Sequence, residues 1–135
     1  MSDIEKDYYA DIFVTGDSLD RPLLASLVSP YIRIYMDGDQ YEITFTSAGQ
    51  NLTVRHKLLI YLLTKKVLWD GGKIEMEGVP PSEIEEETGI PGGSIRPNLG
   101  KLVDARLVQN NQEKGGYYVP NYALEKIKEE LQHGD

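Results

Sequence analysis

The sequence predicts an α+β fold, and two observations carry this prediction. Residues 31–46, "YIRIYMDGDQYEITFT", alternate apolar and polar side chains on either side of Asp37–Gly38, a turn signal typical of a β-hairpin. Residues 52–69 predict a long helix that ends at Gly71–Gly72. At 135 residues, the chain is expected to form one domain with a sizeable core.

The composition is that of a globular protein, with 40% hydrophobic and 27% charged residues. Cysteine is absent, which excludes disulfides, thiolate metal sites and cysteine nucleophiles. No apolar run is long enough to span a bilayer. The first residues, "MSDIEKDYYADI", are acidic and polar where a signal peptide is basic and then apolar. We therefore expect a cytoplasmic protein with no membrane contact.

Charge is distributed unevenly along the chain, whose net charge is −8. The net charge is −6 over residues 1–52, +2 over residues 53–81 and −4 over residues 82–135. An acidic protein repels nucleic acid at long range, so any DNA binding must depend on a local basic face. This distribution argues against a protein that coats DNA tightly and without sequence preference.

Three elements are predicted before the long helix. Residues 9–14 suit a short strand, whose apolar face would carry Ile12 and Val14. Residues 20–28 predict a helix, with Asp20 as its cap and Pro22 in its first turn. The apolar stripe of this helix consists of Leu23, Leu24, Leu27 and Val28. The hairpin at 31–46 has alternating apolar residues, namely Ile32, Ile34, Met36, Ile43 and Phe45.

The long helix is apolar on all sides between Leu58 and Leu63, so it cannot have a solvated face there. We predict that it is sandwiched between the N-terminal hairpin and the segment that follows the helix. Residues 1–50 are accordingly predicted to be an N-terminal extension, with a helix and a β-hairpin, packed on the long helix. This extension and residues 51–135 would then form one integrated unit.

A short strand and a glutamate-rich helix are predicted next. Residues 73–77 alternate as a short strand does, and Ser82 and Glu85 have the spacing of a capping box. The helix dipole favours carboxylates in the first turn of a helix. We therefore interpret these glutamates as helix-start chemistry and not as a functional acidic patch; they are Glu83, Glu85 and Glu86.

The remaining chain predicts a glycine-rich turn, a helix, a second hairpin and a final helix. The helix spans about residues 94–105, and its inward stripe consists of Ile95, Leu99, Leu102 and Val103. Residues 107–109 and 117–119 flank a polar turn as the strands of a hairpin. Asn121 is predicted to cap the final helix, whose inward stripe consists of Leu124, Ile127 and Leu131.

This order of elements resembles a winged helix-turn-helix. The resemblance is carried by "PSEIEEETGIPGGSIRPNLGKLVDARLV" and "GGYYVPNYALEKI" and covers about residues 53–132. The domain that it resembles is the DNA-binding domain of small prokaryotic, archaeal-like transcriptional regulators. The resemblance implies a winged helix-turn-helix at residues 51–135 that ends in a C-terminal helix.

Three residues depart from the pattern of that family. Glu85 stands where the family often has a small residue between the two helices. Arg106 stands where the family favours glycine, and a left-handed conformation there would cost about 1 kcal/mol relative to glycine. Pro97 disfavours helical geometry at Arg96, which favours a start of the second helix at Pro97 in place of Ser94 and would present Arg96 on the turn.

The resemblance implies that the turn and the exposed positions of the second helix face DNA. Arginine can read guanine, asparagine can read adenine, and serine or backbone N–H groups can hold phosphate. Lys114, at the tip of the wing, would touch a phosphate, although Glu113 beside it weakens this expectation. In the alternative interpretation, Arg96 and Lys101 are ordinary solvated charges. The DNA-binding residues implied are Gly92, Gly93, Ser94, Arg96, Asn98, Lys101 and Lys114.

One motif resembles part of a hydrolase active site but lacks the other residues that catalysis needs. "FVTGDSLD" is similar to the first block of the GDSL esterases, with Ser18 as the would-be nucleophile. A serine hydrolase also needs a base. His56 and His133 are the only histidines, and neither lies in the Asp-x-x-His block of that family. We therefore expect no enzyme activity, no catalytic residue, no cofactor and no metal site.

The sequence thus predicts a sequence-specific regulator of transcription that binds double-stranded DNA. A homodimer is expected, with the C-terminal helix or the long helix at its interface, because operators for helix-turn-helix proteins have two-fold symmetry. The alternative is a winged-helix module that contacts another protein and does not bind DNA. The acidity of the chain favours that alternative.

Overall fold

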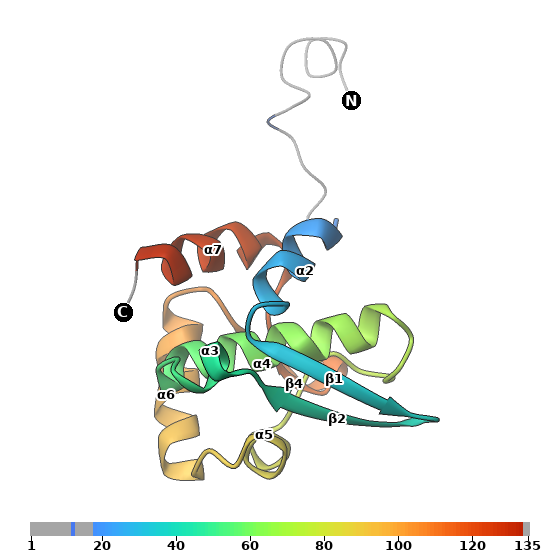
Figure 1. Cartoon of the computed structure of the whole chain (residues 1–135). Helices are drawn as coiled ribbons and strands as arrows, with labels where there is room; N and C mark the ends of the chain where they lie inside the picture. The colour runs from blue at the N-terminus through green and yellow to red at the C-terminus, as the bar shows by residue number, and fades with distance from the viewer. Residues whose placement is uncertain (1–11, 13–17, 134–135) are drawn as a thin grey trace.

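The computed structural model describes residue 12 and residues 18–133, which form an α+β fold with two small antiparallel sheets (Figure 1). The strand predicted for residues 9–14 falls outside the described residues, apart from Ile12. The elements are, in order, α2 (Arg21–Val28), β1 (Ile32–Asp37), β2 (Gln40–Phe45), α3 (Ser47–Gln50), α4 (Val54–Asp70), α5 (Pro81–Thr88), α6 (Gly92–Asp104), β3 (Gln109–Asn111), η1 (Gln112–Lys114), β4 (Gly116–Tyr118), η2 (Asn121–Ala123) and α7 (Leu124–His133).

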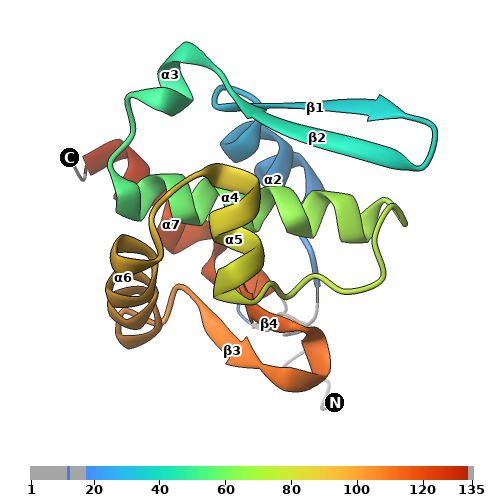
Figure 2. The same ribbon diagram turned by 90° about the horizontal axis from the view of Figure 1, so that it is seen from below.

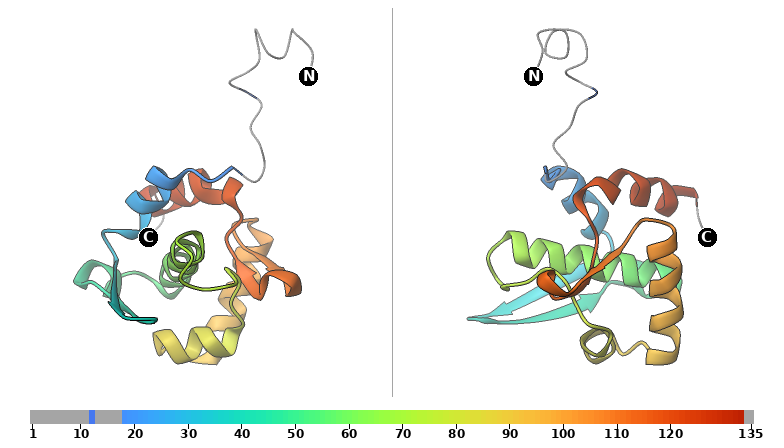
Figure 3. Two further views of the ribbon diagram at one scale, coloured as in Figure 1. Left: turned by 90° about the vertical axis from the view of Figure 1, so that its right-hand side faces the viewer. Right: turned by 180° about the vertical axis from the view of Figure 1, so that it is seen from behind.

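Helix α4 is the centre of the fold. Seen along its axis, it is surrounded by α2 and α7, the hairpin β1–β2, helix α5 and the hairpin β3–β4 (Figure 3). The predicted all-round burial is confirmed, since every residue from Leu58 to Leu63 is at most 1% exposed. Thr53 begins the helix by accepting a hydrogen bond from the His56 N–H at 3.2 Å.

The N-terminal helix and hairpin agree with the sequence prediction. Asp20 caps α2, because its Oδ1 accepts a hydrogen bond from the Leu23 N–H at 3.0 Å. Strands β1 and β2 pair antiparallel, with Ile32 opposite Phe45 and a turn in which Gly38 has a φ of +61°. One hydrophobic cluster contains residues of α2, β1, α4, α5, α6 and α7. The extension contributes to this cluster the buried side chains Leu24, Leu27, Val28 and Ile32.

Ion pairs join the ends of α4 to its neighbours. The Arg21 guanidinium donates to both carboxylate oxygens of Asp70, at 2.7 and 2.8 Å, and so connects α2 to the end of α4. Arg55 donates in the same way to Glu130 on α7, with both distances 2.8 Å. The hydrogen bond from Arg55 holds the pKa of the Glu130 carboxyl below its ordinary value.

The second hairpin is present, but its strands differ from the prediction by up to two residues. Strands β3 and β4 pair with Gln109 opposite Tyr118. Val79 extends this sheet on the other side of β4, where it exchanges two backbone hydrogen bonds of 2.9 Å with Tyr117. The strand predicted at 73–77 is wrong. Its alternating residues pair with no strand in the described part of the chain, and Glu77 turns inward to a lysine of α4.

The prediction that Asn121 caps the last helix is also wrong. Asn121 lies in η2, and its side-chain oxygen accepts a hydrogen bond from Lys66 Nζ at 2.6 Å. The stripe predicted for α7 is confirmed as part of the monomer's own core, with Leu124 and Ile127 buried and Leu131 half-buried. Helices α2 and α7 lie next to each other on the same side of α4 (Figure 1).

Gly116→Ala is expected to destabilise the protein by about 1–3 kcal/mol, because Gly116 has a φ of +133° and a Cβ there would lie 2.6 Å from the Val79 carbonyl oxygen. Gly100→Ala is the matched control. Gly100 lies within α6 with open space around its missing Cβ, so alanine should stabilise the helix by up to about 1 kcal/mol. Urea unfolding of both variants checks this, and equal effects would contradict the geometry of the hairpin.

Candidate nucleic-acid interface

Helices α5 and α6 are joined by a tight turn that local signals define. Gly89 ends α5 in a left-handed conformation with a φ of +76°, and its N–H donates to the Glu85 carbonyl. The Thr88 hydroxyl donates to the Ile84 carbonyl and accepts from the Ile90 N–H, which fixes the chain as it leaves the helix. Figure 2 shows α5 crossing in front of α4, with α6 to one side and the hairpin β3–β4 below.

Two predictions about the starts of these helices are wrong. Pro80 precedes α5 without a side-chain cap, and Ser82 lies inside the helix, so the predicted capping box is not formed. Helix α6 starts at Gly92 and not at Pro97. Pro97 therefore lies within the helix, where it cannot donate to the carbonyl four residues earlier. That carbonyl belongs to Gly93, which is exposed, so water can hydrate it.

The end of α6 has a left-handed residue at Arg106, a position where glycine would avoid the conformational cost. Arg106 has a φ of +63°, the only positive value at a residue other than glycine among those described. Its N–H donates to the Val103 carbonyl at 2.9 Å, and the Leu107 N–H donates to the Leu102 carbonyl at 3.0 Å. This is the Schellman arrangement, which satisfies the last carbonyls of the helix.

The predicted DNA-binding residues of α6 fall into two groups. Gly93, Arg96 and Lys101 are exposed, whereas Ser94 and Asn98 are half-buried. The Asn98 amide donates to the Ser94 carbonyl at 2.8 Å, so part of its hydrogen-bonding capacity is used within the helix. Among the described residues, neither Arg96 nor Lys101 forms an ion pair.

Lys114, the residue predicted at the wing, is turned toward the protein. Its Nζ lies 3.7 Å from Glu77 Oε1 and 4.9 Å from the centroid of the Tyr118 ring. This arrangement combines a weak ion pair with a cation–π contact. Lys114 is therefore not brought together with Arg96 and Lys101 by any described interaction.

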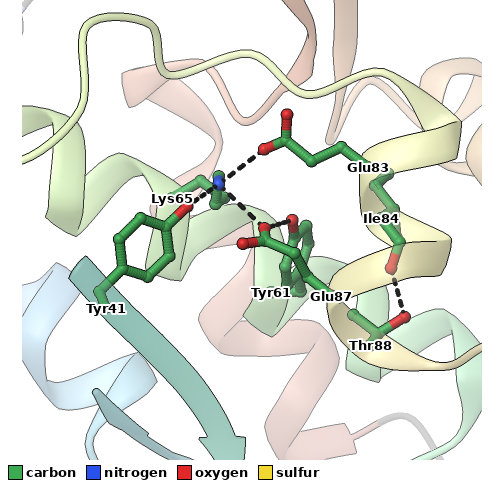
Figure 4. A network of polar contacts seen from close by, with 7 residues as sticks. All are labelled: Tyr41, Tyr61, Lys65, Glu83, Ile84, Glu87 and Thr88. Atoms are coloured by element: carbon green, nitrogen blue, oxygen red, sulfur yellow. Dashed lines mark hydrogen bonds and ion pairs between the residues drawn. The ribbon is translucent and has the colours of Figure 1, made fainter. Parts of the chain in front are cut away.

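Two glutamates of α5 bind a buried lysine of α4 (Figure 4). Lys65 Nζ lies 2.8 Å from Glu83 Oε2 and 3.0 Å from Glu87 Oε1, and it also donates to the Tyr41 hydroxyl of β2 at 2.6 Å. The buried Tyr61 hydroxyl donates to the same oxygen of Glu87. Lys65 thus connects the N-terminal hairpin, α4 and α5.

The environment of Lys65 favours its charged form. Burial by itself would lower the pKa of Lys65, but hydrogen bonds with Glu83, Tyr41 and Glu87 outweigh burial and hold the pKa above its ordinary value. Burial and the hydrogen bond to Glu87 raise the pKa of Tyr61. Two of the four glutamates of α5, Glu83 and Glu87, therefore have a structural role, because Lys65 balances part of their negative charge.

Glu85 lies at the start of α6. A Cβ at Gly92 would be 2.7 Å from Glu85 Oε1 and 3.4 Å from Arg96 Nη1, so both side chains lie over this glycine. A carboxylate near a helix N-terminus is favoured by the helix dipole. Glu85 consequently lies at the N-terminus of α6, close to Arg96.

The buried lysines of α4 were not identified from the sequence. Lys65 is 2% exposed and Lys66 is 1% exposed, although both belong to residue types that are seldom buried. One signal could have indicated them: they directly follow the all-round apolar stretch of a helix covered on every side. The glutamate-rich helix next along the chain supplies the opposite charges for Lys65, and Glu77, just before that helix, supplies the one for Lys66.

Among the described residues, no group of three or more histidine, aspartate or glutamate side chains could hold a metal ion. None of the helices in that part of the chain has both the length and the apolar character needed to cross a bilayer. Comparisons of the sequence with protein-family models and with curated proteins, and of the structure with solved structures, find no match.

Proposed function

We propose that residues 53–132 form a winged helix-turn-helix. The protein would then be a transcriptional regulator that binds double-stranded DNA sequence-specifically and acts in the cytoplasm. One observation carries the proposal. Helix α6 follows a tight turn from α5 and exposes Arg96 and Lys101, which form no ion pair among the described residues. Cationic side chains on a helix that enters the major groove are the usual means of DNA recognition.

The two cations would have different roles. Arg96, near the start of α6, would contact a base edge, where a guanidinium can bind guanine with two hydrogen bonds. Lys101, one to two turns further along, would contact a phosphate. Gly93 and Ser94 would offer backbone or hydroxyl hydrogen bonds to the DNA backbone. Glu85 would oppose phosphate binding at the helix start, so binding should be weak without the proper operator.

A homodimer remains part of this proposal, because two-fold symmetry suits paired half-sites on DNA. The apolar surfaces of α4 and the apolar stripe of α7 are already used in the core of the monomer. A dimer interface would therefore have to use other surfaces.

A second candidate function is a winged-helix module that binds another protein. It is favoured by the exposed face of α6, which contains Gly93, Pro97 and Gly100. None of these residues has a side chain that can hydrogen-bond to a base. Exposed acidic residues lie at the start and the end of this helix, namely Glu85 beside Gly92 and Asp104 in the last turn.

Arg96→Ala is expected to weaken binding to the preferred DNA fragment by about 1–3 kcal/mol and to relax base preference. Lys101→Ala should weaken binding to all sequences alike and reduce the salt dependence. With about three or four phosphates neutralised per subunit, log affinity should fall with log salt at a slope of roughly −3. Mobility-shift assays on genomic fragments at low and high salt measure these effects.

Lys128→Ala is the matched control for both variants, since Lys128 is an exposed cation on α7, outside the proposed interface. It should leave DNA binding unchanged. If no fragment binds at low salt, or if Arg96→Ala and Lys101→Ala behave like the control, the protein-binding function replaces the DNA-binding one.

A further inference from the structure

A cavity of about 280 Å³ lies between the second half of α4, the segment before Val79, the hairpin β3–β4 and η2. Three aromatic side chains, Trp69, Tyr118 and Tyr122, form part of its wall. Trp69 is 38% exposed and Tyr122 is 53% exposed, so both leave a large apolar area outside the core. This cavity is separate from the exposed face of α6.

Hydrogen bonds hold two of the rings in place. The Tyr118 hydroxyl donates to Gln109 Oε1 at 2.6 Å, and Gln109 Nε2 donates to the Tyr122 hydroxyl at 2.9 Å. Because the Tyr122 oxygen accepts from Gln109, its own hydrogen remains available for another acceptor. The wall thus has two rings joined through Gln109 and offers a hydrogen-bond donor.

The charged residues of the cavity have an excess of positive charge. Lys66 Nζ lies 2.7 Å from Glu77 Oε2, and Lys114 Nζ lies 3.7 Å from Glu77 Oε1, so two ammonium groups share one carboxylate. Burial lowers the pKa of Lys66, and its contacts with Glu77 offset this only in part. A further anion would therefore stabilise the ammonium form of Lys66. This local excess of positive charge stands out in a chain of net charge −8.

We propose that this cavity binds a small planar aromatic anion, such as an aromatic carboxylate. Its ring would lie against Trp69 and Tyr122, and its carboxylate would accept hydrogen bonds from Lys114 and the Tyr122 hydroxyl. The volume is near the lower limit of about 300 Å³ for ligand pockets, which fits one or two rings. The site does not depend on DNA binding. If the chain does bind DNA, a ligand here would contact the hairpin β3–β4.

Fluorescence tests this site directly, because Trp69 is the only tryptophan of the chain. Titration of the full-length protein with benzoate should change Trp69 emission in a saturable manner, with a Kd on the order of 1 mM or tighter for so small a ligand. Benzamide has the ring without the charge, and cyclohexanecarboxylate has the charge without the aromatic ring. Both should bind at least about tenfold more weakly, because each lacks one of the two recognised features.

Lys114→Gln and Tyr122→Leu change exposed residues of the wall and should each weaken benzoate binding at least about tenfold. Lys128→Gln, on the exposed face of α7, should bind benzoate as the unaltered protein does. Thermal unfolding verifies that each variant is folded. The proposal is overturned if benzoate gives no saturable change, if either analogue binds equally well, or if Lys114→Gln binds benzoate normally. None of these readouts requires DNA.

Discussion

Removal of residues 1–50 is expected to leave a fragment, 51–135, that does not fold stably. The deleted part contributes four buried aliphatic side chains to the common core, namely Leu24, Leu27, Val28 and Ile32. Each buried aliphatic side chain stabilises a fold by about 1.5–3 kcal/mol, so their loss removes about 6–12 kcal/mol. This is as large as the whole stability of a typical domain, which is about 5–15 kcal/mol.

Circular dichroism during heating, with the full chain and the fragment side by side, measures this effect. Ile32→Ala tests the same contact in an intact chain and should cost about 2–5 kcal/mol. Thr44→Ala is its control, because Thr44 lies on the exposed side of the same hairpin and should change stability by less than about 0.5 kcal/mol. A fragment as stable and soluble as the full chain would show that the extension is a separate part.

Lys66→Met is expected to destabilise the protein by about 3–5 kcal/mol. Lys66 is 1% exposed and its partner Glu77 is 5% exposed, so the substitution leaves a buried carboxylate without its main counter-charge. Lys114 cannot replace that charge, since it lies 3.7 Å from the other carboxylate oxygen and is partly exposed. Urea unfolding at neutral pH measures the loss.

A double variant separates the loss of the ion pair itself from the cost of leaving a buried carboxylate unpaired. Lys66→Met together with Glu77→Leu removes both charges, and it should recover most of the stability because the desolvation cost of both groups disappears. Lys128→Met, at an exposed position on α7, should change the free energy of unfolding by less than about 0.5 kcal/mol. A single Lys66→Met variant as stable as this control would mean that the pair contributes nothing.

Lys65 differs from Lys66 in the number and exposure of its partners. Two carboxylates, Glu83 and Glu87, approach Lys65, and both are more exposed than Glu77. Without Lys65 these two carboxylates could be hydrated, whereas Glu77 could not without rearrangement. The buried pair of Lys66 is therefore expected to matter more for stability, although Lys65 connects more elements.

The candidate interface was only partly predictable. The sequence placed Lys101 on the helix after a glycine turn and Arg96 on the turn itself, whereas the structure has both exposed on α6. The positions of Lys114 and Glu85 could not be predicted in the same way. Lys114 turns to Glu77, and Glu85 reaches across the turn to Gly92, so each depends on how separate elements pack.

Local chemistry in the sequence determined most of the elements. Asp20 immediately precedes a helix and caps it. The alternating residues around Asp37–Gly38 pair as a hairpin. A helix that is apolar on all sides must be covered on all sides, as α4 is. Each of these signals acts between residues that are close along the chain.

Only the tertiary structure decided which polar residues are buried. Lys65 meets carboxylates 18 and 22 residues away, and Lys66 meets Asn121, 55 residues away. The segment at 73–77 alternates like a strand, yet it pairs with no strand among the described residues, and Glu77 turns inward to Lys66. A buried charge is stable only where packing supplies its counter-charge and hydrogen bonds, and these come from elements whose placement no local pattern specifies.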